Sequence, residues 1–291
     1  MPALTAAGVR VYALSYDEAE PLRDFAAAHD ISYRFLSDPE SDVIRAFGIL
    51  NTIIAEDDHP WFGIPYPGTY VMDSAGLITH KFFENNLAVR VGPDQLVRAV
   101  RGQSINEAVP QPEGRAESHT SDVTADVFLA GDALALSVQS ELVARFQVPA
   151  GRHVYAEPAP AGSIAVSLEL DASDGLVTRA LLRPTSEMHT LADTDEAFPV
   201  HHGTVELRLP LTVNGDAYGK NAPREVRLRG RLRWQSCDDT VCDIPITRPF
   251  DLVVPLDAMV PSALMVRDGE IPGEPRGRAH FQQMVDRRQR D

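Results

Sequence analysis

Two cysteines are the side chains of this chain whose type and spacing point most directly to chemistry. Cys237 and Cys242 are its only cysteines, and they lie five positions apart in a sequence of 291 residues. Two cysteines scattered at random in a chain of this length would seldom fall so close together, so the spacing favours a joint role, either as a disulfide or as a pair of ligands. The sequence therefore predicts a thiol–disulfide couple at this point.

The residues around the pair predict a β-hairpin with one cysteine on each side of its loop. From Val226 to Gln235, apolar and basic residues alternate, which is typical of a strand with one apolar and one basic face. Residues 238–241 form a short loop, and the chain returns through apolar residues up to Val254. Two cysteines that flank such a loop can reach the Cα separation of about 5.5 Å that a disulfide requires.

A redox role is the prediction, and two other roles stay open. A disulfide across so short a loop removes little entropy from the unfolded chain, so it would stabilise the fold only weakly. A structural role is therefore the less favoured interpretation. The C-x₄-C spacing fits the outer edge of zinc-site spacings. However, the adjacent His201 and His202 point to opposite faces of a strand. We predict no metal site and no cofactor, with copper or zinc binding by the cysteines kept as an alternative.

Charged neighbours act on the cysteines in both directions. Asp238, Asp239 and Asp243 disfavour a thiolate, whereas Arg233 and Arg248 favour one. The sequence alone does not decide the balance.

The first hundred residues alternate between strand-like and helix-like segments. A hairpin turn at residues 73–76 joins the last two strands. Alternation that ends in a hairpin predicts an α/β layer with a mixed sheet. The expected elements are strands at 9–15, 31–36, 69–72 and 77–83, and helices at 17–29, 39–47 and 93–100.

The pattern changes after residue 102. Residues 103–121 are polar and contain prolines and a glycine, so they are predicted to be a linker. Residues 122–257 hold short apolar alternations separated by Pro and Gly, which predicts an all-β sandwich. Residues 258–291 are a charged tail. The predicted domains are therefore 1–102 and 122–257.

The composition excludes several classes of partner. A net charge of −15 and a pI near 5.0 argue against nucleic acid, because its phosphates require a basic surface. The apolar stretches fall far short of the roughly 20 residues of a membrane helix, so no membrane segment is predicted. The first ten residues lack the charged and apolar regions of a signal peptide, which taken literally indicates the cytoplasm.

The segments GVRVYALSYDEAEPLRDFAAAHDISYRFLSDPESDVIRAFGI and YPGTYVMDSAGLI lie within the first hundred residues. They resemble the alkyl hydroperoxide reductase/thiol-specific antioxidant (AhpC/TSA) family, which implies a thioredoxin-like domain with Pro67 as a cis-proline facing the active site. In that family the reactive cysteine precedes the segment that corresponds to Val9–Ser15. Residues 1–236 contain no cysteine, so no peroxidase or dithiol reductase activity is expected from the chain as given.

The resemblance also implies a central strand before Val9, and the sequence does not contain it. Its loss would leave the adjacent strands without partners, so we expect the natural start to lie upstream. A restored N-terminus would imply antioxidant, peroxiredoxin-type activity and a periplasmic or extracytoplasmic location. The alternative is a docking module in a cytoplasmic protein.

The segment WQSCDDTVCDIPITRPFDLVVPL around the cysteines resembles the N-terminal domain of the thiol:disulfide interchange protein DsbD and the related disulfide bond corrector domains. The resemblance covers about residues 122–256 and implies an immunoglobulin-like sandwich with a cap loop that shields the disulfide. Asp195, Glu196 and Phe198 match that cap, although Ala197 interrupts it. Phe198 has a competing interpretation as an ordinary core residue.

Taken together, the sequence predicts an incomplete thioredoxin-like domain followed by an immunoglobulin-like sandwich. The expected function is thiol–disulfide exchange through Cys237 and Cys242, by thiolate attack and a mixed disulfide. The resemblances imply a thioredoxin-like or DsbD-type redox protein as the partner. A non-enzymatic interaction module with a structural disulfide is the alternative.

Overall fold

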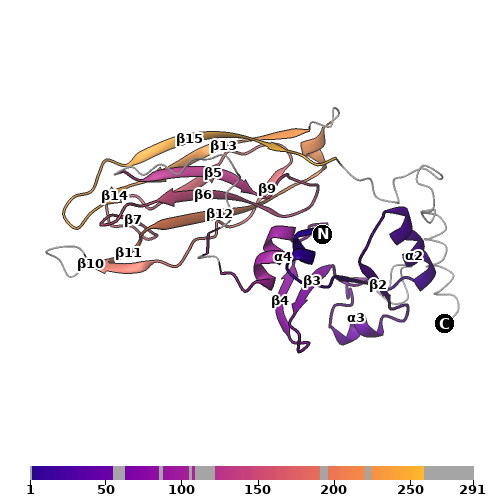
Figure 1. Ribbon diagram of the computed structural model, residues 1–291. Helices are drawn as coiled ribbons and strands as arrows, with labels where there is room; N and C mark the ends of the chain where they lie inside the picture. The colour runs from indigo at the N-terminus through magenta and orange to yellow at the C-terminus, as the bar shows by residue number, and fades with distance from the viewer. Residues whose placement is uncertain are drawn as a thin grey trace. The chain divides into compact units, whose positions relative to one another are not determined.

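The computed structural model describes residues 2–54, 63–84, 88–104, 107–108, 122–190, 196–219 and 224–258. These residues form two compact units, one of residues 2–84 and one of residues 88–258 (Figure 1). Most of the predicted linker, Asp195 of the predicted cap and nearly all of the predicted tail lie outside the described residues.

The first unit follows the predicted alternation of strands and helices, but it does not form one sheet. Strand β1 pairs with β2 in parallel and β3 pairs with β4 antiparallel, and no ladder joins the two pairs within the described residues. The predicted mixed sheet is absent there because no strand lies hydrogen-bonded between β1 and β3. The elements are α1 (Pro2–Ala6), β1 (Tyr12–Ser15), α2 (Ala19–Ala28), β2 (Arg34–Ser37), α3 (Asp42–Ala46), β3 (Gly68–Met72) and β4 (Ile78–Phe83).

Two aspartates shape the turns of this unit. The carboxylate of Asp38 accepts hydrogen bonds from the backbone N–H groups of Val43 and Ile44, so it caps α3 although the helix begins later than predicted. Asp73 Oδ1 accepts from the N–H groups of residues 75 and 77 and closes the predicted hairpin turn. The last turn residue, Gly76, has a φ of 83°, a conformation that glycine adopts without strain.

The second unit consists mainly of strands. Its elements are α4 (Pro93–Val100), β5 (Thr124–Ala130), β6 (Ser140–Gln147), β7 (His153–Tyr155), β8 (Ser167–Leu170), β9 (Leu176–Thr178), β10 (Glu187–Thr190), β11 (Ala197–His201), β12 (Thr204–Val213), the short 3-10 helix η1 (Gly215–Tyr218), β13 (Glu225–Trp234), β14 (Ser236–Cys237) and β15 (Ile246–Pro255).

Two of its sheets enclose the core and confirm the predicted sandwich. One sheet has the order β5-β6-β12-β9 and the other β15-β13-β8, and one continuous cluster includes Leu142, Leu209 and Leu232 from both. Strand β13 shows the predicted alternation, with Leu228 and Leu232 fully buried and the arginines between them exposed. The remaining strands form a third sheet, β10-β11-β7-β14, which gathers at one end of the sandwich (Figure 1).

Helix α4 packs with the second unit, whereas its position in the sequence indicated the first domain. Arg98 reaches the buried carboxylate of Glu141 on β6 at 2.7 Å, and Gln95 donates to the same oxygen at 3.2 Å. A Cβ atom at Gly92 would lie 2.1 Å from the carbonyl oxygen of Gln139, so the approach requires glycine. Among the described residues, no helix has the length and apolar character needed to cross a bilayer.

Candidate functional site

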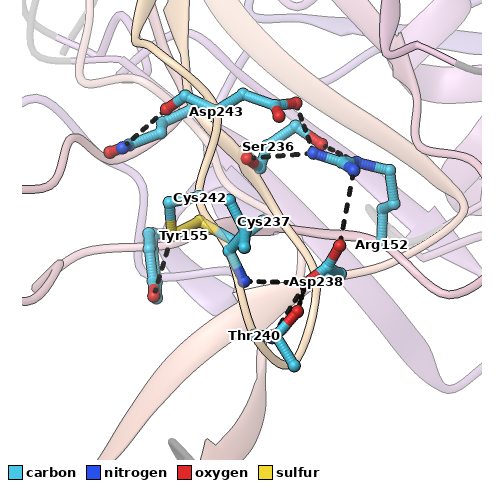
Figure 2. A network of polar contacts seen from close by, with 10 residues as sticks. Arg152, Tyr155, Ser236, Cys237, Asp238, Thr240, Cys242 and Asp243 are labelled. Carbon is cyan, nitrogen blue, oxygen red and sulfur yellow. Dashed lines mark hydrogen bonds and ion pairs between the residues drawn. A yellow bond between two sulfur atoms is a disulfide. The ribbon is translucent and has the colours of Figure 1, made fainter.

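The predicted cysteine pair is a disulfide in the structure. Cys237 ends β14, and Cys242 lies opposite it on the returning segment, joined by an antiparallel bridge (Figure 2). Their Cα atoms are 4.0 Å apart, which is closer than the predicted separation of about 5.5 Å.

Backbone hydrogen bonds on both sides of the pair explain this short separation. Asp238 N donates to Val241 O at 2.9 Å, and Asp243 N donates to Ser236 O at 2.8 Å, so the cysteines form the non-hydrogen-bonded pair between them. Residues in such a pair lie about 4.5 Å apart. The loop is closed by Asp238 Oδ1, which accepts at 2.8 Å from Thr240 N, Thr240 Oγ1 and Val241 N. These backbone hydrogen bonds, with the Thr240 hydroxyl, lower the pKa of Asp238 to about 2 and keep it ionised.

The two sulfur-bearing residues differ in burial. Cys237 has no exposed surface, whereas Cys242 is exposed. Cys237 forms a small apolar cluster with Tyr155 and Val200, against which Phe198 packs. Val154, whose side chain points to the other face of β7, belongs to the main core instead. The third sheet therefore has one face on the core and the other on the disulfide.

Arg152 joins both cysteine-bearing segments on the opposite face of this sheet. Its Nε donates to Ser236 Oγ at 2.6 Å, and one terminal nitrogen donates to the carboxylate of Asp243. The other terminal nitrogen lies 3.8 Å from Asp238 Oδ2 (Figure 2). One guanidinium thus touches the residue before Cys237 and the residues after both cysteines.

Tyr155 contacts the exposed sulfur from the buried side. Its hydroxyl lies 3.8 Å from Cys242 Sγ, and because a disulfide sulfur carries no hydrogen, the hydroxyl is the donor (Figure 2). Burial raises the pKa of Tyr155, so the hydroxyl stays protonated at neutral pH.

Sequence reasoning missed both Arg152 and Tyr155 as parts of the site. Both belong to the segment 148–156 (VPAGRHVYA), which also resembles the DsbD family, but their contacts to the hairpin are long-range. Arg248, one of the two cations that the sequence set beside the cysteines, instead donates to the carbonyl oxygen of Ala125 and lies over the ring of Trp234.

Histidines gather beside the disulfide. His153 is the register partner of Cys237 and lies on the same face of the sheet, with its ring centroid 4.6 Å from that of His189 and 5.9 Å from that of His202. Burial, followed by the neighbouring His189 and His202, lowers the pKa of His153 to about 4. His201 points to the other face, as predicted for adjacent strand residues, and burial lowers its pKa too. Among the described residues, no three His, Cys, Asp or Glu side chains are arranged to hold a metal ion.

The predicted cap is described only in part. Asp195 lies outside the described residues, and Glu196 is exposed just before β11. Phe198 packs on the cluster of Cys237, while on β10 His189 Nε2 lies 3.5 Å from Asp239 Oδ1 in the cysteine loop. The β10–β11 hairpin therefore contacts both the buried cysteine's cluster and the loop between the cysteines.

The structure corrects the prediction of a cis bond at Pro67. Among the described residues the cis peptide bond is Glu157–Pro158, so Tyr66–Pro67 is trans. Leu50 and Pro65 form an antiparallel bridge, and Tyr66 N donates to Ile49 O just before β3 begins. The extended path that this pairing sets is satisfied by the trans isomer, which X–Pro bonds prefer by about 0.5–1 kcal/mol.

Comparison with known families confirms both resemblances. Residues 1–81 match the AhpC/TSA family, and residues 125–254 match the family described as thiol:disulfide interchange protein DsbD, N-terminal. Neither match covers half of the chain. Comparison with curated proteins gives no match.

Several solved structures are similar to the chain at low identity. The N-terminal domain of DsbD from Neisseria meningitidis, in the reduced form, is 18% identical, with 46% of this chain and 86% of that chain covered and a TM-score of 0.30. The N-terminal periplasmic domain of ScsB from Proteus mirabilis is 14% identical, with 56% and 53% covered and a TM-score of 0.32. The CssB subunit from enterotoxigenic Escherichia coli, complemented with a donor strand from CssA, is 12% identical, with 47% and 98% covered and a TM-score of 0.25.

The disulfide and the family match together support a thiol–disulfide redox function in general. The described site can hold two sulfur atoms in bonding position, one buried and one open to solvent.

Proposed function

We propose that this protein exchanges electrons with a thioredoxin-like protein through the disulfide of Cys237 and Cys242. The observation that carries the proposal is the contrast in burial within one disulfide, with Cys237 enclosed and Cys242 exposed. A purely structural disulfide does not require an exposed sulfur, whereas thiol–disulfide exchange requires that a partner's thiolate reach one of the two sulfur atoms.

The contrast assigns a role to each cysteine. A thiolate of the reduced partner attacks Cys242 Sγ, a sulfur–sulfur bond forms between the proteins, and Cys237 leaves as a thiolate that takes up a proton. The partner's second thiol, as a thiolate, then attacks the partner's own sulfur in the mixed disulfide and releases Cys242. Two electrons and two protons have then passed to the cysteine pair, and the partner holds the disulfide.

The surface around Cys242 is suited to a protein partner. Ile244 is 85% exposed and Val241 is 60% exposed, and these apolar side chains flank the accessible sulfur. Because Cys242 belongs to a non-hydrogen-bonded pair, its N–H and C=O point away from β14, where a partner's backbone can meet them.

Single-cysteine variants test the assignment. In Cys237→Ser, we expect the Cys242 thiol of the folded protein to react rapidly with a small chromogenic disulfide and to form a mixed disulfide with a thioredoxin-like protein. In Cys242→Ser, the enclosed Cys237 should react at least about a hundredfold more slowly, because reaction requires local opening. Equal rates in the folded variants would contradict the assignment.

A structural disulfide is the rival, and the reduction potential separates the two. A structural bond in a small domain has a potential below about −300 mV, which thioredoxin-like proteins reduce poorly. We expect a less negative value, measured by equilibration with glutathione. A potential below about −300 mV would show that the disulfide is structural.

The cap forms part of the proposal. Phe198 packs on the Cys237 cluster, and we assign it, with Glu196 beside it, to shielding the Cys237 side of the disulfide, so that attack is directed to Cys242. Phe198→Ala should then speed reduction by a small thiol, whereas a plain core role would change stability without changing that rate. The prediction for Asp195 lies outside the described residues.

We assign the first unit to the thioredoxin-like fold and the second to the immunoglobulin-like sandwich. The match of residues 1–81 and the alternation of strands and helices support the first, and the match of residues 125–254 supports the second. The predicted limits at residues 102 and 122 remain predictions. Residues 1–236 contain no cysteine, so the proposed chemistry belongs to the second unit.

A further inference from the structure

Three aspartates lie next to the disulfide, and Arg152 meets two of them. Asp238 follows Cys237 and Asp243 follows Cys242, so an uncompensated hairpin would place negative charge beside each sulfur. Neighbouring carboxylates repel each other and disfavour a thiolate beside them. The Arg152 guanidinium contacts both carboxylates, and its side chain is only 22% exposed, which limits screening by solvent.

The contacts of Arg152 also bridge three segments. Arg152 directly precedes β7, and β7 pairs with β14 on the side away from Cys242. From there the guanidinium donates to Ser236 Oγ and the Ser236 carbonyl oxygen on β14, and then to Asp243 on the returning segment (Figure 2). The backbone of Arg152 is itself held, because its carbonyl oxygen lies 3.0 Å from His202 Nδ1.

The segment that carries Cys242 keeps several hydrogen bonds once the disulfide is broken. Asp243 N still donates to Ser236 O at 2.8 Å, Gln235 Nε2 to Asp243 O at 3.0 Å and Asp238 N to Val241 O at 2.9 Å. Beyond Asp243 the segment continues into β15, which pairs with β13 from Ile246 onward. The contact of Arg152 with Asp243 adds a charge-assisted hydrogen bond that crosses β14, and such bonds are about twice as strong as neutral ones, so it adds to what keeps the two thiols facing each other.

We propose that Arg152 is a positioning residue of the redox site, which holds Cys242 opposite Cys237 in the reduced protein and thereby sets how readily the disulfide re-forms. The inference rests on the proposed exchange function only for its biological use. Its physical content is the stability of the disulfide relative to the dithiol, and that can be measured without a protein partner.

Equilibration of the full chain with reduced and oxidised glutathione tests the proposal. We expect Arg152→Gln to lower the equilibrium constant for disulfide formation about tenfold, which for this two-electron couple is about 30 mV toward less negative potentials. Arg152→Lys should recover less than half of the loss, because an ammonium cannot reach the three partners that the guanidinium fork reaches. Loss of the cation should also move the pH midpoint for alkylation of Cys242 upward.

The matched control is Arg231→Gln, which removes another cross-strand arginine of the same unit, paired with Glu169 on β8. It should leave both readouts unchanged. If Arg152→Gln does not fold, Ser236→Ala removes one acceptor of the same guanidinium, and a shift of about threefold in the same direction is expected.

An unchanged potential in the folded variants would overturn the role of Arg152 and leave the exchange function intact. Conversely, if the wild-type chain fails to react with a thioredoxin-like protein while Arg152→Gln still shifts the glutathione equilibrium, the proposed function fails and the positioning role stands.

Discussion

The two units of this chain carry different parts of a redox protein. The first resembles a family of thiol enzymes but contains no cysteine, and its buried apolar side chains are few among the described residues, including Leu4, Leu22 and Ile44. The second packs one continuous core between two sheets and carries the disulfide on a third. A well-packed scaffold can enclose one sulfur while it presents the other, and the disulfide lies in the unit with the larger core, not in the unit that matches the AhpC/TSA family.

The largest expected effect compares the cores of the two units. Leu232→Ala should destabilise the second unit by about 3–5 kcal/mol, because Leu232 is fully buried between rigid sheets that cannot close around a cavity. Ile44→Ala in the first unit removes an equally buried side chain, but few other apolar side chains are buried in the described part of that unit, so the site can collapse more easily and a loss near about 2 kcal/mol is expected. Denaturant unfolding measures both, and equal losses would break the comparison.

Native-state hydrogen exchange should show the same contrast without a mutation. We expect the slowest amides of β6, β12 and β13 to exchange at least about a hundredfold more slowly than those of β1 and β3, a difference of about 2.7 kcal/mol in opening free energy. The reason is that the former strands are paired on both sides inside the core, whereas β1 and β3 are each paired on one side among the described residues. Similar protection in both units would show that they unfold together.

Acid should weaken the second unit through a buried histidine that the first unit does not contain among its described residues. The pKa of His153 is lowered to about 4 in the folded protein, whereas an unfolded histidine titrates near about 6.5, so between these values the unfolded chain binds a proton that the native protein does not. The contribution of His153 to stability is therefore expected to fall as the pH drops from 6.5 to 4, by no more than about 1.4 kcal/mol per pH unit, and His201, whose pKa burial also lowers, adds to the slope. Denaturation midpoints across this range measure the slope. His153→Gln should make it shallower, and an unchanged slope would assign the acid sensitivity to other groups.

The smallest expected effect uses two exposed isoleucines, one in each unit. Ile244→Ser, beside Cys242, should slow reduction by a thioredoxin-like protein about three- to tenfold, because most single interface side chains contribute only modestly when they are truncated. Ile53→Ser in the first unit removes an isoleucine that is 79% exposed and should leave the rate unchanged. Reduction by dithiothreitol should be unaffected in both, since a small thiol makes no use of the surface. A slower reaction in Ile53→Ser would give the first unit a share in partner binding.

The features that the sequence predicted well are local ones. The alternation from Val226 to Gln235 is a period-two pattern that is legible in any short window, and it became the strand that leads to Cys237. The loop of residues 238–241 likewise follows from the aspartate that accepts hydrogen bonds from its own turn.

The features that it missed depend on contacts between distant segments. Arg152 lies 84 residues before Ser236, and no local pattern shows that the two meet. The burial of Cys237 against the exposure of Cys242 depends on the packing of Tyr155 and Val200, which come from two other strands. The cis bond at Pro67 was inferred from the family resemblance. This prediction was wrong, because the backbone pairing before β3 is satisfied by a trans bond.

Helix α4 bears on where the sandwich begins along the chain. It lies at residues 93–100, outside both matched segments, yet its Arg98 and Gln95 provide the partners of the buried Glu141. A break in the chain anywhere after α4 would separate this carboxylate from the guanidinium and the amide that pair with it. A fragment that is to keep the sandwich intact should therefore begin before residue 93, ahead of both the helix and the segment matched to a known family.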